Sequence, residues 1–510
     1  MTPVEASILL IASVIITVFI CVILERRVWR YGAYPPVVGT VVHQLINFST
    51  LHHFHLGHAQ KHTTYRLLSP ARGELYTVNP ANLQHILKTN FANYGKGKYQ
   101  HEVLKDLFGD GIFAVDGERW KTQRKLASYE FSTKVLREFS CKVFCKNAVK
   151  LAGKISEAAK SHLIMDIQDL LMKATMDSLF KVGFGLELNT LLGCEEENKF
   201  AKAFGELSAQ LLRRFTNPLW KLERFLSLGP EAMLRKNIKF IDDFVYKIIQ
   251  QKREQVSKEH DSLEKHRKED ILSRFLVESE KYHEKMSDKY LRDIILNFLI
   301  AGRDTTAGTL SWFFYLLCKH PHIQEKIAQE VRESVCTKNE GNVEGVTMSG
   351  FADALTEGAL GRLQFLHAAL AETLRLYPAV PVNAKVAFGD DVLPDGSKVR
   401  KGDMVNYLSY AMGRMTSIWG DDAHHFQPER WIQNGVFQPK TPFEFPAFQG
   451  GPRICLGKDF AYLQMKVMAA VLIRFFKFKL RDEEQEAHYH TMLTLHIDHG
   501  LHVYAFSQNI

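Results

Sequence analysis

The feature that most constrains the fold is a long apolar stretch in the middle of the chain, DKYLRDIILNFLIAGRDTTAGTLSWFFYLLCKHP. Its pattern predicts one helix that begins at Asp288, whose side chain can cap it, and ends at His320 before Pro321. Apolar residues lie on nearly every face, so we expect this helix to be buried at the centre of the molecule. The chain also contains short strand-like segments, one at residues 73–79 and others that begin with residues 384–388. The sequence therefore predicts a mainly α fold with a minor antiparallel β portion.

The N-terminus carries an uncharged run, residues 6–24, that is long enough to cross the hydrocarbon core of a bilayer. Arg26, Arg27 and Arg30 follow it, and the positive-inside rule then places the rest of the chain in the cytosol. A cleaved signal peptide is the alternative, but the run is longer than an ordinary signal core and LERRVWR offers no small-residue cleavage site. We therefore predict residues 1–33 to be a single-pass membrane anchor with a basic flank.

The rest of the chain, residues 34–510, is expected to form one large domain. It contains no Gly/Ser linker, no low-complexity tract and no repeat of fixed period. Residues 34–40 begin it with two prolines and a glycine, which predicts a stiff hinge between membrane and globular body.

Charge and cysteine content narrow the classes of function. The formal net charge of +8 is modest for 510 residues and indicates no nucleic-acid partner, although it fits a protein near an anionic membrane or an acidic partner. The seven cysteines are odd in number, scattered and without CxxC spacing, so neither a disulfide framework nor a zinc site is indicated.

One cysteine, Cys455, lies in a loop of unusual composition, FQGGPRICLG. The glycines allow this loop to turn and its backbone to approach a flat ligand closely. A cysteine thiolate donates electrons strongly to a metal, and as an axial ligand to heme iron it favours cleavage of the O–O bond. The alternative is a buried free cysteine in a glycine-rich turn. The spacing F-x-x-G-x-R-x-C-x-G, formed by Phe448, Gly451, Arg453, Cys455 and Gly457, favours the heme ligand.

A second motif, AGRDTT, lies in the middle of the apolar helix. An acidic and a hydroxyl side chain, Asp304 and Thr305, are costly to bury there and need a reason. Gly302 weakens the helix locally, and the Thr305 hydroxyl can compete for the carbonyl of Ala301 four residues back, which would open a notch. A polar kink with a structural role alone is the alternative, and the motif by itself does not decide between them.

Two further motifs complete the pattern. Glu372 and Arg375 in ETLRLYP are three residues apart and share one helix face, and Trp120 and Arg124 in GERWKTQRK are four apart. Together with the cysteine loop and AGRDTT, these motifs resemble the cytochrome P450 superfamily of heme-thiolate monooxygenases, and the resemblance covers essentially the whole chain. It implies the cytochrome P450 fold with a single N-terminal transmembrane helix in the endoplasmic reticulum membrane, its catalytic domain facing the cytosol.

The resemblance also implies roles for individual residues. Heme is the implied cofactor and O₂ the co-substrate, with Cys455 as the axial ligand and Asp304 and Thr305 delivering protons to oxygen. Glu372, Arg375 and, in PERW, Arg430 are expected to form a structural network that supports the cysteine loop. The other residues expected around the heme are Ala301, Phe448, Gly451, Arg453, Trp120, Arg124 and Lys385, the last with an exposed lysine on a strand as the alternative.

Several stretches, among them VDGERWKTQRKLASYEFS and FPAFQGGPRICLGKDFAYLQMK, are similar to the plant branch of the superfamily that oxidises fatty acids. This implies ω-hydroxylation, attack on the terminal methyl of long-chain fatty acids for cutin, suberin or spore and pollen wall polymers. A primary C–H bond is harder to break than its neighbours, so a narrow apolar channel must present only the chain end. The candidate walls, each an ordinary core residue in the alternative, are Phe108, Ile112, Phe113, Leu211, Phe215, Leu299, Val380, Val382 and Leu495.

Partners are implied as well. The chain has no flavin or nicotinamide fingerprint, so electrons are expected from NADPH through a separate NADPH–cytochrome P450 reductase, with cytochrome b5 as a further donor. Arg213 and Arg214 are candidates for binding the fatty-acid carboxylate, with a solvated or membrane-facing basic patch as the alternative. Residues 217–230 are candidates for dipping into the lipid membrane. The candidate docking face for the reductase, or else a scatter of surface lysines, consists of Lys121, Lys125, Lys142, Lys146 and Lys458.

Other functions remain open at this point. An in-chain hydroxylase or epoxygenase of fatty acids or of another lipophilic substrate would use the same motifs. A reductase-independent heme-thiolate isomerase or dehydratase is disfavoured because AGRDTT and the cysteine loop are both intact. A non-enzymatic heme binder would not require Asp304 and Thr305.

Overall fold

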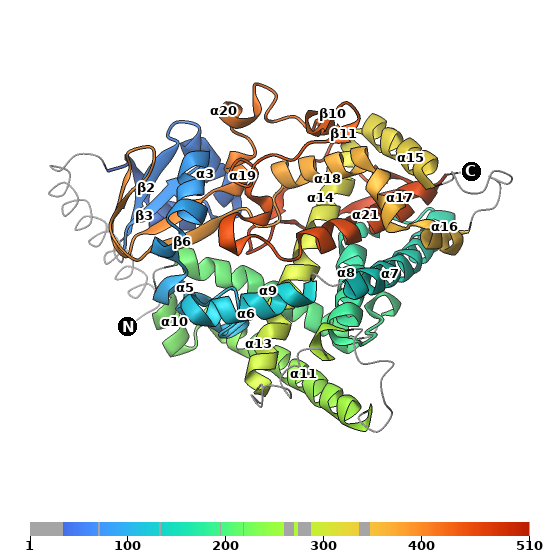
Figure 1. Cartoon of the computed structure of the whole chain (residues 1–510), viewed down its shortest axis with the longest axis horizontal. Helices are drawn as coiled ribbons and strands as arrows, with labels where there is room; N and C mark the ends of the chain where they lie inside the picture. The colour runs from blue at the N-terminus through green and yellow to red at the C-terminus, as the bar shows by residue number, and fades with distance from the viewer. Residues whose placement is uncertain are drawn as a thin grey trace, which may run out of the picture.

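The computed structural model describes residues 34–69, 72–131, 134–193, 195–217, 219–259, 270–273, 287–335 and 347–508. Helices form most of the molecule, and the largest sheet lies at one end of it, on the left in Figure 1. The expected mainly α fold is confirmed. The helices are α2 (Val41–Ile46), α3 (Leu51–Ala59), α4 (Pro80–Gln84), α5 (Gly97–Phe108), α6 (Gly117–Phe131), α7 (Lys134–Lys160), α8 (Ile167–Phe184), α9 (Glu195–Thr216), α10 (Trp220–Leu226), α11 (Gly229–Glu259), α13 (Asp288–Leu299), α14 (Thr305–Lys319), α15 (Pro321–Val335), α16 (Met348–Ala354), α17 (Glu357–Arg362), α18 (Gln364–Leu376), α19 (Ser409–Met412), α20 (Thr416–Trp419) and α21 (Lys458–Phe475).

The largest sheet has six strands in the order β1-β2-β3-β9-β6-β4. Strand β1 pairs in parallel with β2, and β3 with β9, whereas the other pairs are antiparallel, so this sheet is mixed where the sequence predicted antiparallel strands alone. The strands are β1 (Val37–Thr40), β2 (Thr64–Leu68), β3 (Glu74–Thr77), β4 (Tyr94–Gly95), β5 (Met165–Asp166), β6 (Asn383–Ala387), β7 (Asp391–Val392), β8 (Lys398–Val399), β9 (Met404–Tyr407), β10 (Ile432–Gln433), β11 (Val436–Phe437), β12 (Phe476–Leu480), β13 (Tyr489–His490), β14 (His496–Ile497) and β15 (His502–Ser507).

The segment expected to be a hinge, residues 34–40, is largely part of this sheet. Val37–Thr40 form β1, and the backbone N–H of Arg66 donates to the Pro36 carbonyl at 2.8 Å. Residues 1–33, which contain the expected membrane anchor, lie outside the described residues. Within the described ranges, no helix is both long and apolar enough to span a bilayer.

The central apolar stretch forms two α-helices joined by a π-helical turn, with no break in direction. Helix α13 is followed by the turn Ile300–Asp304 and then by α14, which packs against α8, α18, α15 and α21. The cap of α13 is Ser287, whose hydroxyl accepts from the Tyr290 N–H at 3.2 Å, and not Asp288 as expected. Apart from this one-residue shift, the predicted buried helix is present.

Two large apolar clusters fill most of the interior, and a small third one surrounds Trp419 and Trp431. Of the two large clusters, the larger surrounds α14 and α21, and the other, called here the α9 cluster, lies between α5, α9, α11 and α13. The π-helical turn therefore lies where the two clusters meet, because Ile300 belongs to the α9 cluster and Ala307 to the larger one.

A histidine on α3 is buried, and among the described residues its ring has no hydrogen-bond partner. His52 is 2% exposed, neither ring nitrogen has a hydrogen bond, and its ring centroid lies 4.9 Å from that of Tyr489 and 5.6 Å from that of Tyr410. Burial, with the nearby charges of His53 and Arg414, lowers the pKa of His52 to about 3. The unfolded chain therefore binds a proton at this position below pH 6.5, whereas the folded chain does so only near pH 3.

Replacing His52 by phenylalanine is expected to reduce the loss of stability in acid. At about pH 5 the neutral buried imidazole lowers the free energy of unfolding by about 2 kcal/mol relative to neutral pH, because each pKa unit is worth roughly 1.4 kcal/mol. Urea unfolding of His52→Phe and wild type at neutral and acid pH measures this difference. The control is His62→Gln, because His62 is exposed. If the free energy of unfolding falls by the same amount between neutral and acid pH in His52→Phe and wild type, the expectation is contradicted.

Candidate active site

The cysteine loop lies directly before α21 and is held by its own backbone. The N–H of Cys455 donates to the carbonyl of Phe448 at 2.8 Å, and the Phe448 ring lies 5.3 Å from that of Tyr462. Gly451 has φ +61°, and a Cβ at this position would lie 1.8 Å from the carbonyl oxygen of Leu87. The glycine is therefore required both by the backbone conformation and by the close approach of a neighbouring segment.

Cys455 is exposed, although the surrounding protein reduces the hydration of its thiol. Burial raises the pKa of this thiol, while the backbone N–H of Gly457 and the positive charges of Arg124 and Lys458 lower it. Those three groups favour the thiolate, which is the form that binds a metal.

Three basic side chains gather beside this loop. Lys385 on β6 is 3% exposed, so it is not the exposed strand lysine of the alternative, and its pKa is lowered by burial and by the charges of Lys96 and Arg453. Burial, together with Arg453, lowers the pKa of Lys96 to about 8. Among the described residues, the carboxylate that faces all three is Asp116, whose Oδ1 lies 2.6 Å from Nη2 of Arg453.

Helix α6 contributes Trp120 and Arg124 to the same region. The Arg453 guanidinium lies over the ring of Trp120, with 4.5 Å between its central carbon and the ring centroid. Burial lowers the pKa of Arg124 and the charge of Cys455 raises it, so Arg124 faces the cysteine. The structure thus brings together Cys455, Arg453, Trp120, Arg124 and Lys385.

This arrangement fits heme. Three cations, the buried Lys385 and the half-buried Lys96 and Arg453, face one carboxylate. This excess of positive charge is costly unless an anion joins them. The two propionates of heme are such anions, and Nε of Arg453 is buried without a hydrogen-bond partner. Cys455 would hold the iron, and Lys96, Lys385 and Arg453 would hold the propionates.

The notch expected in the central helix is present. The Thr305 hydroxyl donates to the carbonyl of Ala301 at 2.5 Å, and the backbone widens into the π-helical turn at this place. A Cβ on Gly302 would lie 2.9 Å from Leu179 of α8, so the glycine also permits close packing of the two helices. Ala301 and Thr305 remain half-buried, whereas the intervening Arg303 and Asp304 are buried.

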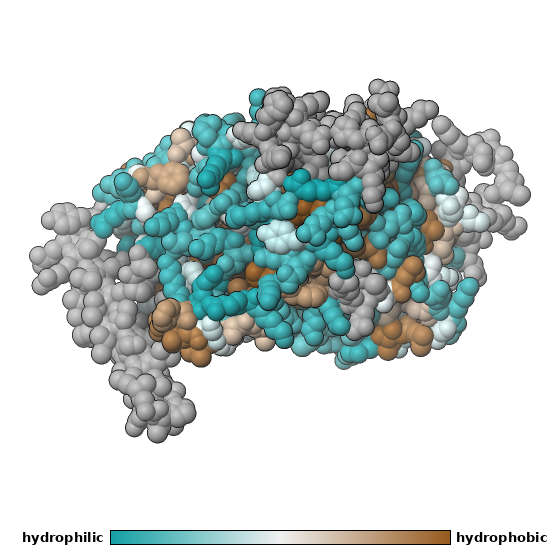
Figure 2. Space-filling view, turned by 90° about the horizontal axis from the view of Figure 1, so that it is seen from below, coloured by the Kyte–Doolittle hydropathy of each residue, from teal (hydrophilic) through white to brown (hydrophobic). Residues whose placement is uncertain are grey.

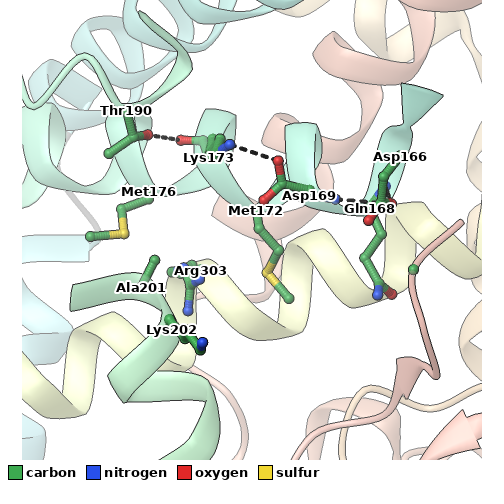
Figure 3. Close-up of a pocket in the computed structure, with 11 residues that line it drawn as sticks. Asp166, Gln168, Asp169, Met172, Lys173, Met176, Thr190, Ala201, Lys202 and Arg303 are labelled. Carbon is green, nitrogen blue, oxygen red and sulfur yellow. Dashed lines mark hydrogen bonds and ion pairs between the residues drawn. The ribbon is translucent and has the colours of Figure 1, made fainter. Parts of the chain in front are cut away.

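Asp304 is completely buried and paired with its neighbour in sequence. Nη1 of Arg303 lies 2.8 Å from Oδ1 of Asp304, and Oδ2 has no partner among the described residues. Arg303 reaches a cavity of about 420 Å³ between α8 and α9, where Figure 3 shows it beside Ala201 and Lys202. His496 lies near this pair, and burial lowers its pKa to about 4 although Asp304 raises it.

Glu372 lies at the centre of a buried network. Its two oxygens accept from Nε and Nη2 of Arg375, each at 2.8 Å, and from Nε of Arg430 and Nε1 of Trp431, also at 2.8 Å. Arg375 also donates to the carbonyls of Gly413, Ala423 and His425. The network thus ties α18 to the long segment that precedes the cysteine loop.

The candidate pocket walls divide into two groups. Phe108, Leu211, Phe215 and Leu299 join the α9 cluster, while Val382 and Leu495 pack with the larger cluster. Leu211 and Leu299 are 0% exposed and Leu495 is 1% exposed, which fits the alternative of ordinary core residues for these three. The candidates with accessible surface are Ile112, Phe113, Phe215, Val380 and Val382.

Arg214 is not available for a substrate carboxylate. It is 1% exposed, and its guanidinium bonds to both oxygens of Glu231, at 2.7 and 2.6 Å, and to Asp106 at 2.8 Å. These contacts tie α9 to α11 and α5, so the residue has a structural role, in contrast to the expected one. Arg213 is exposed.

An apolar patch covers α10 and the turn after it. Leu222, Phe225, Leu226 and Leu228 are each more than half exposed, and Phe225 is 83% exposed. Figure 2 shows hydrophobic surface at the end of the molecule where Figure 1 places α10. Large exposed apolar patches are typical of interaction sites with membranes or other proteins.

Sequence reasoning missed several members of the site. Arg303 lies inside the AGRDTT motif, and its charge next to Asp304 was a signal that an ion pair forms there. Lys96, Asp116 and His496 carried no such signal, because only the packing of distant segments brings them to the site.

The cysteine loop, the basic cluster beside it and the notched helix are the parts that a heme-thiolate site requires. The family model described as Cytochrome P450 matches residues 35–503. The chain is 52% identical to cytochrome P450 704C1 of Pinus taeda, over 94% of this chain and 93% of that protein. It is 44% identical to cytochrome P450 704B1 of Arabidopsis thaliana, over 92% and 93%, and 38% identical to cytochrome P450 94A2 of Vicia sativa, over 79% and 76%. The chain belongs to the cytochrome P450 family, whose members are heme-containing monooxygenases that receive electrons from a redox partner.

Proposed function

We propose that this monooxygenase hydroxylates long-chain fatty acids at the terminal methyl, for cutin, suberin or spore and pollen wall polymers. The observation that carries the proposal is the notch at Ala301–Thr305, which lies at the junction of two apolar clusters. Half-buried apolar side chains, among them Ile112, Phe215 and Val382, suit an extended hydrocarbon chain. The similarity of the motifs to the fatty-acid-oxidising plant branch supports the same substrate class.

Heme, when bound, supplies the iron at which O₂ is reduced, so that one oxygen atom enters the substrate and the other leaves as water. The protein holds the Cys455 thiolate beside that iron, and the backbone N–H of Gly457 and the charge of Arg124 stabilise the thiolate. Thr305 provides a hydroxyl at the notch, and Arg303 fixes the Asp304 carboxylate next to it. Arg303 also lines the cavity between α8 and α9, through which water would supply protons to this pair.

Replacing Thr305 by alanine is expected to reduce product formation by roughly 10²-fold, the usual contribution of a positioned proton donor. NADPH consumption should fall much less, since electron delivery does not involve the hydroxyl, so most electrons would produce peroxide or water. Product and NADPH are measured together in the reconstituted system. Thr305→Ser, which keeps the hydroxyl, is the control, and unchanged coupling in Thr305→Ala would contradict this role.

The proposal extends to the membrane and to the electron donor. A membrane anchor in residues 1–33 would hold the protein on the endoplasmic reticulum with the catalytic domain in the cytosol, and the apolar patch on α10 would contact the bilayer in which the fatty acid dissolves. NADPH–cytochrome P450 reductase, and cytochrome b5, would dock on the exposed lysines of α6 and α7. Those lysines are Lys121, Lys125, Lys142 and Lys146, together with Lys458 at the start of α21.

The deciding experiment uses microsomes that contain this protein and a plant NADPH reductase. Saturated, unsaturated and epoxy fatty acids of several lengths are supplied, and mass spectrometry locates the added oxygen. Terminal alcohols are the expected product. In-chain alcohols or epoxides would show that the oxidised position is not the terminal methyl, while the substrate class would stand. If no fatty acid is oxidised, the proposal is overturned.

A further inference from the structure

Helix α13 carries polar side chains that are buried in an otherwise apolar helix. Arg292, Asp293 and Asn297 are 5%, 3% and 2% exposed. Residues three or four positions apart project on the same side of a helix, as Asp293 and Asn297 do. In α13 that side faces the end of α5 and the loop after it, residues 109–113. Buried polar groups need partners, and these three find theirs in the backbone of that segment.

Asn297 holds the loop at both ends. Its Nδ2 donates to the carbonyl of Phe108 at 3.0 Å, and its Oδ1 accepts from the N–H of Phe113 at 3.2 Å. Asp293 holds the middle, because its Oδ2 accepts from the N–H of Asp110 at 2.9 Å.

Two glycines allow the loop to lie directly against the helix. A Cβ on Gly111 would lie 2.1 Å from Nδ2 of Asn297, and one on Gly109 would lie 2.0 Å from Oδ1 of Asp293. Gly109 also has φ +54°, which side chains disfavour. No larger residue fits at either position while the contacts with Asn297 and Asp293 persist.

The loop carries apolar side chains next to the part of α13 that leads to the notch at Ala301–Thr305. The rings of Phe108 and Phe113 lie 5.6 Å apart, Phe113 is 37% exposed and Ile112 is half-buried. Asn297 precedes Ala301 by four residues, which is about one turn or ~6 Å along the helix. The amide of Asn297 therefore fixes the position of these side chains relative to the notch.

We propose that Asn297, assisted by Asp293, is a positioning residue that determines which carbon of the lipid chain is oxidised. This inference rests on the proposed function, because it assumes an extended lipid chain as substrate. Ile112 and Phe113 limit how far the chain advances past the notch, and the two hydrogen bonds of Asn297 keep that limit fixed. Misplacement by about 1 Å can change the rate at one position by ~10²-fold.

The test compares Asn297→Ala, Gly111→Ala and wild type as heme-containing proteins. Asn297→Ala releases the loop, and Gly111→Ala pushes it away from the helix while leaving Asn297 in place. Ser311→Ala is the matched control, since Ser311 is a fully buried residue of α14 and, among the described residues, its hydroxyl bonds only to the carbonyl of Ala307 in its own helix, at 2.7 Å. The readouts are the distribution of oxidised positions and hydrogen exchange at the amides of Asp110 and Phe113.

In both loop variants the ratio of terminal to in-chain product is expected to fall by about tenfold or more, and the Phe113 amide is expected to exchange faster, while Ser311→Ala behaves as wild type. A wild-type product ratio in Asn297→Ala and Gly111→Ala would overturn the inference. If the wild-type protein oxidises another lipophilic class, the proposed function fails, and the product ratio on that substrate tests the inference. Unchanged exchange at Asp110 and Phe113 in Asn297→Ala overturns it whatever the substrate.

Discussion

Cys455→Ser is expected to lose monooxygenase activity by on the order of 10³-fold or more while the protein still folds. Serine is nearly isosteric with cysteine, and the backbone bond from residue 455 to Phe448 does not involve the side chain. The hydroxyl, however, is a far weaker electron donor than a thiolate, so the electron donation to iron that favours O–O cleavage is lost. The measurements are product formed per heme and the red-shifted absorption band that a thiolate ligand gives the reduced carbon-monoxide complex.

A second cysteine gives the control for this change. Cys141 on α7 is half-buried, and its thiol contacts the carbonyl of Leu355 at 3.7 Å and the thiol of Cys145. Neither contact involves the cysteine loop, so Cys141→Ser should keep both the band and the activity. A Cys455→Ser protein that kept the thiolate band would show that another residue ligates the iron. The basic cluster predicts in addition that Cys455→Ser still takes up heme, because Lys96, Lys385 and Arg453 would hold the propionates without help from the sulfur.

The notch and the cysteine loop were predictable because local interactions form them. The bond from Thr305 to Ala301 joins residues four positions apart on one helix, and the bond from Cys455 to Phe448 joins residues seven positions apart in one loop. Both follow from residue types at fixed spacing, whatever lies around them. The helix cap is Ser287 and not the expected Asp288. Serine and aspartate can both cap a helix, and the sequence pattern alone does not distinguish between two such neighbours.

Features that depend on distant segments were predicted less well. Arg214 forms ion pairs with Glu231 and Asp106. No pattern in α9 indicates that two acidic residues on other elements contact it. Leu211, Leu299 and Leu495 are apolar residues near the expected pocket, but whether such a residue faces a ligand or the core depends on side-chain packing. Apolar character predicts burial, and it does not distinguish between these two kinds of buried surface.

Glu372→Gln is expected to destabilise the protein by roughly 3–5 kcal/mol, since removing one partner of a buried ion pair leaves the others uncompensated. Both Glu372 and Arg375 are completely buried, and Arg430 also depends on the same carboxylate. Glutamine keeps the shape but turns an N–H₂ group toward donors of Arg375, Arg430 or Trp431. Urea unfolding followed through the heme absorption measures the change, and the yield of heme-containing protein should fall with it.

The structural role of this network has a separate consequence for catalysis. In the part of the chain that the structure describes, no hydrogen bond of this network is with Cys455 or with the notch. The activity of each Glu372→Gln molecule that retains heme is therefore expected to stay within a few fold of wild type. Glu118 and Lys121 provide the matched control, because they form an exposed pair at the same three-residue spacing and Glu118→Gln should change stability by about 1 kcal/mol or less. If both variants unfold at the same urea concentration, burial of the Glu372 network does not stabilise the fold. If Glu372→Gln loses activity without losing stability, the carboxylate acts in the reaction and not in holding the segment that leads to Cys455.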